Sequence, residues 1–309
     1  MNNYSQIIKT ENDSKHISQI VKMPKNDVIN KEGGKPNGLF GHKVIVTSGS
    51  VKLENDYVDM EFSIPFDNNL EPNEAEIKFY NLSKDTIKGF KSDAVITVTA
   101  GYGNDTGIIF NGRIRKIKTK YESVDKVTTI YALDDQSMKD RELQEIAYAA
   151  NVKSSYILKD LLKRTGLPIA IFKVQRDFVN KDSTKIDGSL INAISDYAKD
   201  CGVDVYIQKG KIYALDVRKA SKDINFTICP DTGLIGSPEE FEEEVEEENY
   251  TETIKGYKIE MLLQYKIEVG VKIRLNSKNV TGNAGIFSVR SGEHSYNGSE
   301  MITSIEVVM

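Results

Sequence analysis

Two periodicities of apolar residues divide this chain into strand-rich ends and a helical middle. Early in the chain apolar and polar residues alternate, which predicts half-buried strands. These strands are predicted at 41–53, Tyr57–Pro65, Ala75–Tyr80, Ala94–Tyr102, Gly107–Tyr121 and Lys126–Leu133. Between them Lys84–Phe90 follows Ser83, a good N-cap, and predicts a short helix. The pattern indicates a small, mostly antiparallel barrel.

The period changes after residue 150. Apolar residues in Ser155–Gly166 and Gly188–Ala198 recur at helical spacing, and each stripe predicts an amphipathic helix. Ile169–Val174 predicts a strand, and Val203–Gln208 with Lys211–Asp216 predicts a hairpin around a Lys-Gly turn. We expect a compact α+β module here.

Strand patterns return after Ser221. They cover Ile224–Ile228, Gly256–Leu263, Val271–Leu275, Gly285–Val289 and Thr303–Val308, with Gly/Asn turns between several of them. We expect a second small barrel. The polar segment at the N-terminus is either a loosely ordered arm or an arm docked through Ile17–Val21 as an edge strand.

The expected fold class is therefore α+β, mostly β. Its parts are a polar arm (1–38), a first antiparallel β-barrel (39–145), an α+β module (146–220) and a second β-barrel (221–309). An acidic loop at 239–248 belongs to the second barrel.

Composition narrows the possible partners. The 309 residues carry a formal net charge of -5, which argues against sequence-specific nucleic acid binding. No stretch is apolar and long enough to insert in a membrane, and no signal peptide is recognised. Cys201 and Cys229 are far apart in sequence and suit reduced thiols of a protein folded in the cytoplasm.

No residue pattern predicts catalysis, a cofactor or a metal site. The histidines His16, His42 and His294 lack further ligands at metal-binding spacing. Ser291–Ser295, which contains His294, is expected to be a turn because no nucleophile elbow accompanies it. Gly101–Gly107 resembles a phosphate loop but precedes a strand, so a hairpin turn is favoured.

The most unusual segment is an acidic run with eight glutamates in ten residues. Its members are Glu239, Glu240, Phe241, Glu242, Glu243, Glu244, Val245, Glu246, Glu247 and Glu248. One interpretation is a solvated loop between strands. The other is an interaction element in which Phe241 and Val245 form an apolar stripe and the glutamates meet a basic neighbour or line a lumen.

A basic cluster lies on one predicted strand. It comprises Arg113, Arg115, Lys116, Lys118 and Lys120. Strict alternation places the arginines on one face and the lysines on the other. A bulge near Arg115 and Lys116 would bring all five charges to one side. That side is either a solvent face or a docking face.

The ordered succession of segments resembles a known family. "EFSIPFDNNLEPNEAEIKFYNLS", "AGYGNDTGIIFNGRI" and "IDGSLINAISDYAKDCGVDVYIQKGKIYALD" are similar to segments of the late-control-protein-D-like baseplate hub proteins. These hubs occur in contractile phage tails and in phage-tail-like bacteriocins. The resemblance covers roughly residues 50 to 309.

The resemblance implies a non-enzymatic homotrimer with two tail-tube-like barrels per chain. It further implies a pseudo-six-fold ring that joins the tail tube protein to the central spike protein, with baseplate wedge or other hub proteins as neighbours. Such a particle assembles in the host bacterial cytoplasm. A tail-associated peptidoglycan hydrolase and a receptor- or carbohydrate-binding tail module are the alternatives.

Overall fold

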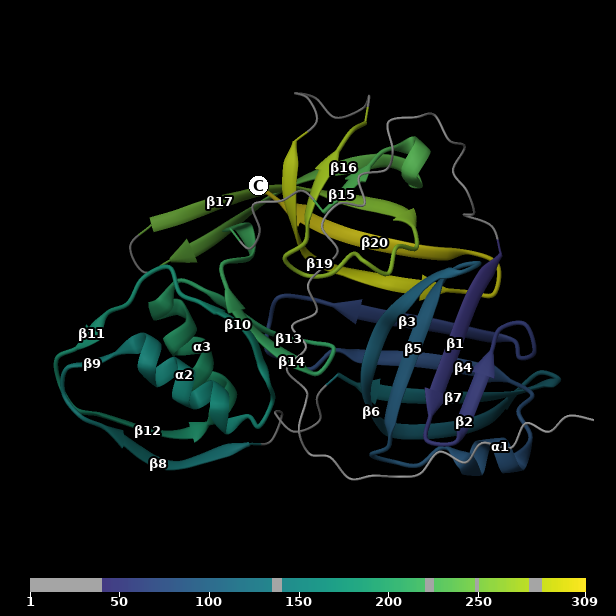
Figure 1. Ribbon diagram of the computed structural model, residues 1–309, viewed down its shortest axis with the longest axis horizontal. Coiled ribbons are helices and arrows are strands. Elements are labelled where there is room, and N and C mark those ends of the chain that lie inside the picture. Colours follow the sequence, from purple (N-terminus) through teal and green to yellow (C-terminus); the bar gives the residue numbers. More distant parts are fainter. Residues whose placement is uncertain (1–40, 135–140, 220–224, 248–249, 278–284) are drawn as a thin grey trace, which may run out of the picture. The chain divides into compact units, whose positions relative to one another are not determined.

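A single large β-sheet runs through most of the computed structural model (Figure 1). The structure describes residues 41–309 except 135–140, 220–224, 248–249 and 278–284, and the side chains at 245–252 are also left undescribed. The expected arm at 1–38, Ile17–Val21 included, lies outside the described residues. The structure contains many more strands than helices, which confirms the expected fold class, α+β and mostly β.

The first part of the chain supplies seven strands of the sheet and one short helix. They are β1 (His42–Ser48), β2 (Val51–Glu54), β3 (Met60–Phe66), β4 (Glu74–Tyr80), α1 (Lys84–Gly89), β5 (Val95–Tyr102), β6 (Asp105–Glu122) and β7 (Asp125–Leu133). Ser83 caps α1 as expected, since its side chain accepts a hydrogen bond from the backbone N–H of Thr86. The strand predicted from Tyr57 begins only at Met60, because Tyr57 still donates a turn hydrogen bond to Glu54.

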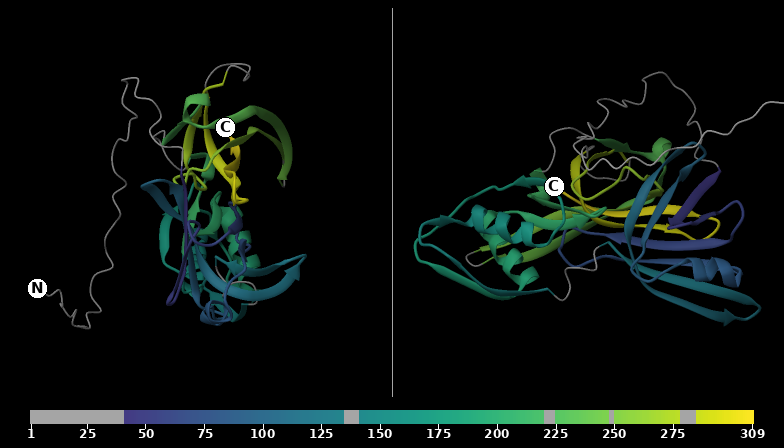
Figure 2. Two further views of the ribbon diagram at one scale, coloured as in Figure 1. Left: turned by 90° about the vertical axis from the view of Figure 1, so that its right-hand side faces the viewer. Right: turned by 60° about the horizontal axis from the view of Figure 1, so that its bottom comes forward.

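The middle of the chain forms the α+β module. Its elements are β8 (Glu142–Tyr148), β9 (Val152–Lys153), α2 (Ser154–Arg164), β10 (Ile169–Lys173), β11 (Val179–Asn180), β12 (Thr184–Ser189), α3 (Leu190–Cys201), β13 (Asp204–Gln208) and β14 (Lys211–Leu215). Both predicted helices are confirmed, and they pack on the β10-β14-β13 sheet around a core of their own (Figure 2). Gly202 ends α3 in the left-handed region at φ 63°, where glycine carries no steric penalty.

The last part returns to the large sheet. It contains β15 (Phe226–Ile228), β16 (Leu234–Glu247), β17 (Tyr250–Leu262), β18 (Lys272–Leu275), β19 (Ile286–Tyr296) and β20 (Met301–Val308), with 3-10 turns at Val217–Lys219 and Pro230–Thr232. The sheet has the order β16-β17-β20-β19-β3-β4-β7-β6-β5-β1-β2, and β15 and β18 branch from β19.

The strands expected in two barrels share one sheet, because β3 pairs with β19, and no closed barrel is found among the described strands. Among the described strands the ladder is an open path with β16 and β2 at its ends. Two cores nevertheless persist. Met301 lies in the first core and Ile305 and Val307 lie in the other, so both cores share one face of β20.

The β3–β19 seam leaves no room at Gly292, which stands opposite Phe66. A Cβ there would lie 2.4 Å from the carbonyl oxygen of Ser304 and 2.6 Å from the Phe66 ring. The carbonyl belongs to the ladder and cannot move without breaking it.

We expect Gly292→Ala to lower the free energy of unfolding by about 1–3 kcal/mol, the usual cost of overpacking. Urea denaturation followed by circular dichroism measures the change. Ser291→Ala, at the neighbouring position, is the control and should change stability by less than about 1 kcal/mol. Equal stability of Gly292→Ala and wild type would contradict a tightly packed seam.

Candidate functional site

His294, the histidine nearest to a serine-rich motif, is a buried structural residue. It lies inside β19 and is 2% exposed, so the expected turn at Ser291–Ser295 is wrong. The Thr303 hydroxyl accepts a hydrogen bond from the N–H of Gln264 and lies 2.8 Å from Nδ1. The ring also makes a hydrogen bond with the backbone of Ile267. A neutral ring satisfies both contacts.

Burial and then the nearby Lys209 lower the pKa of His294 to about 3. The ring touches Phe66, and both residues border a cavity of only about 30 Å³ that Ile267 also lines. These facts argue against a general base at this position.

The thiols and the glycine-rich loop are equally unsuited to chemistry. Cys201 is buried at the end of α3, and desolvation raises its pKa to about 11. A thiol held protonated is a poor nucleophile. Gly101–Gly107 forms the turn between β5 and β6, as expected. Within the described ranges no group of three or more potential metal-ligating side chains occurs. The described helices are too short or too polar to cross a bilayer.

The acidic run forms a strand, and the expected loop at 239–248 is wrong. Residues up to Glu247 belong to β16 and pair with β17, while Glu248 lies outside the described residues. The pairing places Phe241 opposite Gly256, and a Cβ on that glycine would lie 2.8 Å from the Phe241 ring. Phe241 therefore covers the gap that a glycine leaves in a strand.

Basic residues of neighbouring strands neutralise part of the acidic run. Arg290 of β19 lies 2.6 Å from Glu243 and 3.2 Å from Glu306, with its guanidinium 5.7 Å from the Phe241 ring centre. Burial opposes the charge on Arg290, but its hydrogen bonds to Glu243 and Glu306 prevail and raise its pKa. Lys255 pairs with Glu242. Sequence reasoning missed these partners because nothing local links Arg290 to a strand 47 residues earlier.

The outer edge of β16 has no strand beside it among the described residues. Glu239, Glu240 and Glu244 are exposed. Glu239 stands opposite Lys258 in the ladder. The hydrogen bond to Glu242 and then the charge of Glu240 raise the pKa of Lys255. β17 pairs with β20 only from Gly256 onward, so the distal half of the β16–β17 hairpin extends past the sheet (Figure 1).

The basic residues of β6 lie on one side, because a bulge is present where the sequence allowed one. The pairing of β6 with β7 shifts register between Ile114 and Lys116. Ile114 is fully buried and Ile117 packs against the same core, which leaves the basic cluster exposed. Arg115 pairs with Glu74 at 3.1 Å and Arg113 with Asp93 at 3.8 Å.

The second half of β6 is also an open edge. β5 pairs with β6 only as far as Arg113, and Asp93 and Ala94 extend the contact to Ile114. From Lys116 to Glu122 the strand has β7 on one side and, among the described residues, no strand on the other. Tyr121 on this stretch is 76% exposed.

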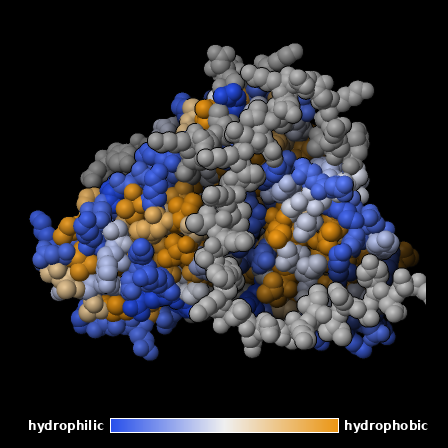
Figure 3. Space-filling view, viewed as in Figure 1, coloured by the Kyte–Doolittle hydropathy of each residue, from blue (hydrophilic) through white to orange (hydrophobic). Residues whose placement is uncertain are grey.

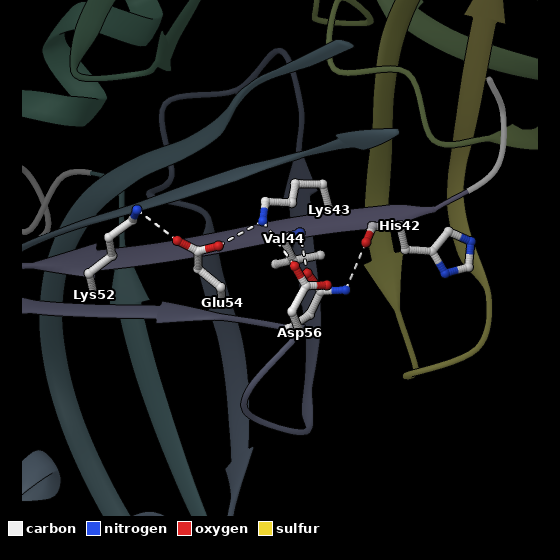
Figure 4. Close-up of polar contacts among 7 residues, drawn as sticks. His42, Lys43, Val44, Lys52, Glu54 and Asp56 are labelled. Atoms are coloured by element: carbon white, nitrogen blue, oxygen red, sulfur yellow. Dashed lines mark hydrogen bonds and ion pairs between the residues drawn. The ribbon is translucent and has the colours of Figure 1, made fainter. Parts of the chain in front are cut away.

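Another sheet edge is β2, a short strand that polar contacts tie to β1 (Figure 4). Asn55 accepts from the N–H of Val44 and donates to the carbonyl of His42, both at 2.8 Å, in place of a further strand residue. Hydrogen bonds from Lys43 and Lys52 lower the pKa of Glu54 to about 2. Edges blunted in this way resist pairing with other chains.

Exposed apolar side chains gather on the α+β module (Figure 3). Tyr156, Phe178 and Val179 surround the start of α2 and are 63%, 55% and 49% exposed. The described structure contains nothing that covers them.

The fold is similar to that of solved tail proteins. A tail protein from Neisseria meningitidis MC58 matches with a TM-score of 0.63 and 9% identity over 87% of this chain and 97% of that one. The 43 kDa tail protein of prophage MuSo2 from Shewanella oneidensis matches with a TM-score of 0.62, 9% identity and the same coverages.

The family follows from the sequence. The family model described as "Baseplate hub gp41" matches residues 43–291, and the chain belongs to this family of phage tail baseplate hub proteins. The E. coli c3393 protein, a component of the type VI secretion system, matches with a TM-score of 0.55 and 9% identity over 85% of this chain and 76% of its own. A search of curated proteins finds no match.

The buried state of His294 sets the direction of a pH effect. An unfolded histidine titrates near pH 6.5, whereas folded His294 takes up a proton only near pH 3. Its contribution to stability is complete above pH 6.5 and is lost as pH falls toward 3, by up to about 1.4 kcal/mol per pH unit.

We expect His294→Gln, compared with wild type by urea denaturation at pH 7.0, 6.0 and 5.0, to be less stable at pH 7.0 and to lose less stability on acidification. The matched control is His42→Gln, whose ring packs between Tyr102 and Tyr296. The same pH slope in wild type and His294→Gln would show that His294 is not held neutral.

Proposed function

We propose that this chain is the structural hub of a contractile-tail baseplate, in which three copies form a pseudo-six-fold ring between the tail tube and the central spike. The observation that carries this proposal is the family membership over residues 43–291. Two separate cores on one sheet support it, since each can present a similar tube-like unit.

The proposed partners are a second and third copy of the chain, the tail tube protein, the spike protein, and wedge or other hub proteins. Large interfaces on the order of 2,000–5,000 Å² hold obligate complexes of this kind. The particle would be a phage tail or an R-type bacteriocin assembled in the bacterial cytoplasm. Charged open strand edges suit a protein that is completed by neighbours.

The hub is proposed to perform no chemistry. His294 and Cys201, the residues closest to hydrolase chemistry, are both buried and held in their neutral forms. The peptidoglycan hydrolase and the carbohydrate-binding module gain no support from a described side chain.

The number of hub chains in the assembled complex tests the proposed ring. We expect native mass spectrometry of the hub co-expressed with the tube and spike proteins encoded beside it to give three hub chains per complex, because a ring of two-unit chains must match a six-fold tube. A stable complex with two or six hub chains would contradict the proposed ring.

Purified cell walls test whether the protein lacks hydrolase activity. We expect no clearing by the pure protein above a buffer control, with lysozyme as the positive control. Clearing that a single substitution in this chain abolishes, such as His294→Gln or Cys201→Ser, would overturn the non-enzymatic assignment.

A further inference from the structure

We infer that the acidic edge of β16 in one copy pairs, strand to strand, with the basic edge of β6 in the next copy. This inference rests on the proposed ring of copies and names the surfaces that would build it. The two edges are Glu239–Glu247 of β16 and Lys116–Glu122 of β6.

Both edges carry backbone hydrogen-bonding groups that no strand of the described structure pairs with. In an antiparallel ladder alternate residues direct their N–H and C=O away from the existing neighbour. β16 uses one side for β17 and β6 uses one side for β7, so each offers the other side. Such a row is a template for another strand.

The charges of the two edges are complementary. Glutamates occupy both faces of β16, with Glu240, Glu242 and Glu244 on one and Glu239 and Glu243 on the other. Lys116, Lys118 and Lys120 occupy one face of the β6 edge. An opposed lysine therefore meets glutamates whichever face of β16 it shares. Opposite charges across a ladder stabilise it, and like charges destabilise it.

The same charges disfavour pairing between two identical edges of neighbouring copies. Two β16 edges would oppose glutamates to glutamates, and two β6 edges would oppose lysines to lysines. Only the β16–β6 combination is favoured, and it uses different surfaces on the two copies. Head-to-tail contacts of this kind form a ring when the rotation between neighbours closes, whereas two-fold dimers need a self-complementary patch. The β2 edge is a weaker template, because it has only four residues and carries the charged Lys52 and Glu54.

An exposed aromatic side chain on the β6 edge also supports this pairing. Tyr121 is 76% exposed beside the lysines, and a large aromatic on an open strand is stabilised by cross-strand contact. A strand laid along β6 would cover it.

Charge exchange tests the pairing directly. The first variant carries Glu239→Lys, Glu240→Lys and Glu244→Lys, which spares the internal pairs of Glu242 and Glu243. The second carries Lys116→Glu, Lys118→Glu and Lys120→Glu, which spares the pair of Arg115 with Glu74. The third combines all six changes. Thermal unfolding confirms that each variant keeps the wild-type fold.

We expect each single-edge variant, co-expressed with the tube and spike proteins, to associate about a hundredfold more weakly than wild type, because like charges face each other. The combined variant should recover association, since opposite charges face each other again with exchanged signs. Native mass spectrometry and sedimentation measure both.

The possible results distinguish a failure of the strand pairing from a failure of the proposed ring. If wild type shows no complex with several hub chains, the proposed ring fails and this pairing fails with it. If wild type and both single-edge variants form the same complex, the ring stands and the pairing is overturned. Loss in the single-edge variants without recovery in the combined variant also overturns it.

Hydrogen exchange gives an independent readout that does not depend on charge. Assembly should slow amide exchange in peptides covering Glu239–Glu247 and Lys116–Glu122, while Val51–Glu54 of β2 serves as the internal control. Unchanged exchange in the two edge peptides of the assembled hub would overturn the pairing.

Discussion

The structure depends on one long-range ladder, the pairing of β3 with β19. It joins residues 230 positions apart, and the Ser63 hydroxyl donates to the Glu293 carboxylate at 2.8 Å across it. Because of this seam the two cores lie along one face of β20. The tight contact at Gly292 is the local requirement of that junction.

A continuous sheet must end somewhere, and this one ends differently at each edge. β2 has only four residues and carries charged side chains. β16 and the second half of β6 have no further strand beside them in the described part of the chain, and they carry opposite charges. Charge protects an open edge from indiscriminate pairing and leaves it available to a complementary one. In the assembly that we propose, the contact surfaces are backbone edges selected by side-chain charge.

Local patterns predicted the parts of this fold that depend on local physics. The stripes of α2 and α3 and the β5–β6 hairpin were legible in the sequence, and a bulge at Arg115 was one of the two arrangements that it allowed. The β3–β19 pairing was not legible, because the polar run Ser291–Ser295 has the composition of a turn. Its hydrogen-bond partners Thr303 and Ser63 become apparent only in the folded structure. The acidic strand was hidden in the same way, since adjacent glutamates disfavour a strand unless Arg290 and Lys255 compensate them. The roles of the acidic and basic residues remain predictions.

The seam also has a consequence for biosynthesis. Tyr296 and Met301 belong to the first core, which otherwise consists of residues from the front half of the chain, apart from Leu263. The ribosome releases these residues long after the rest of the first core, so that core stays incomplete until β19 and β20 have been made. Contacts this distant in sequence also form slowly, because closing such a loop is entropically costly. A nascent hub therefore cannot present a finished β6 edge before β19 and β20 have emerged, and any association through that edge is delayed until then.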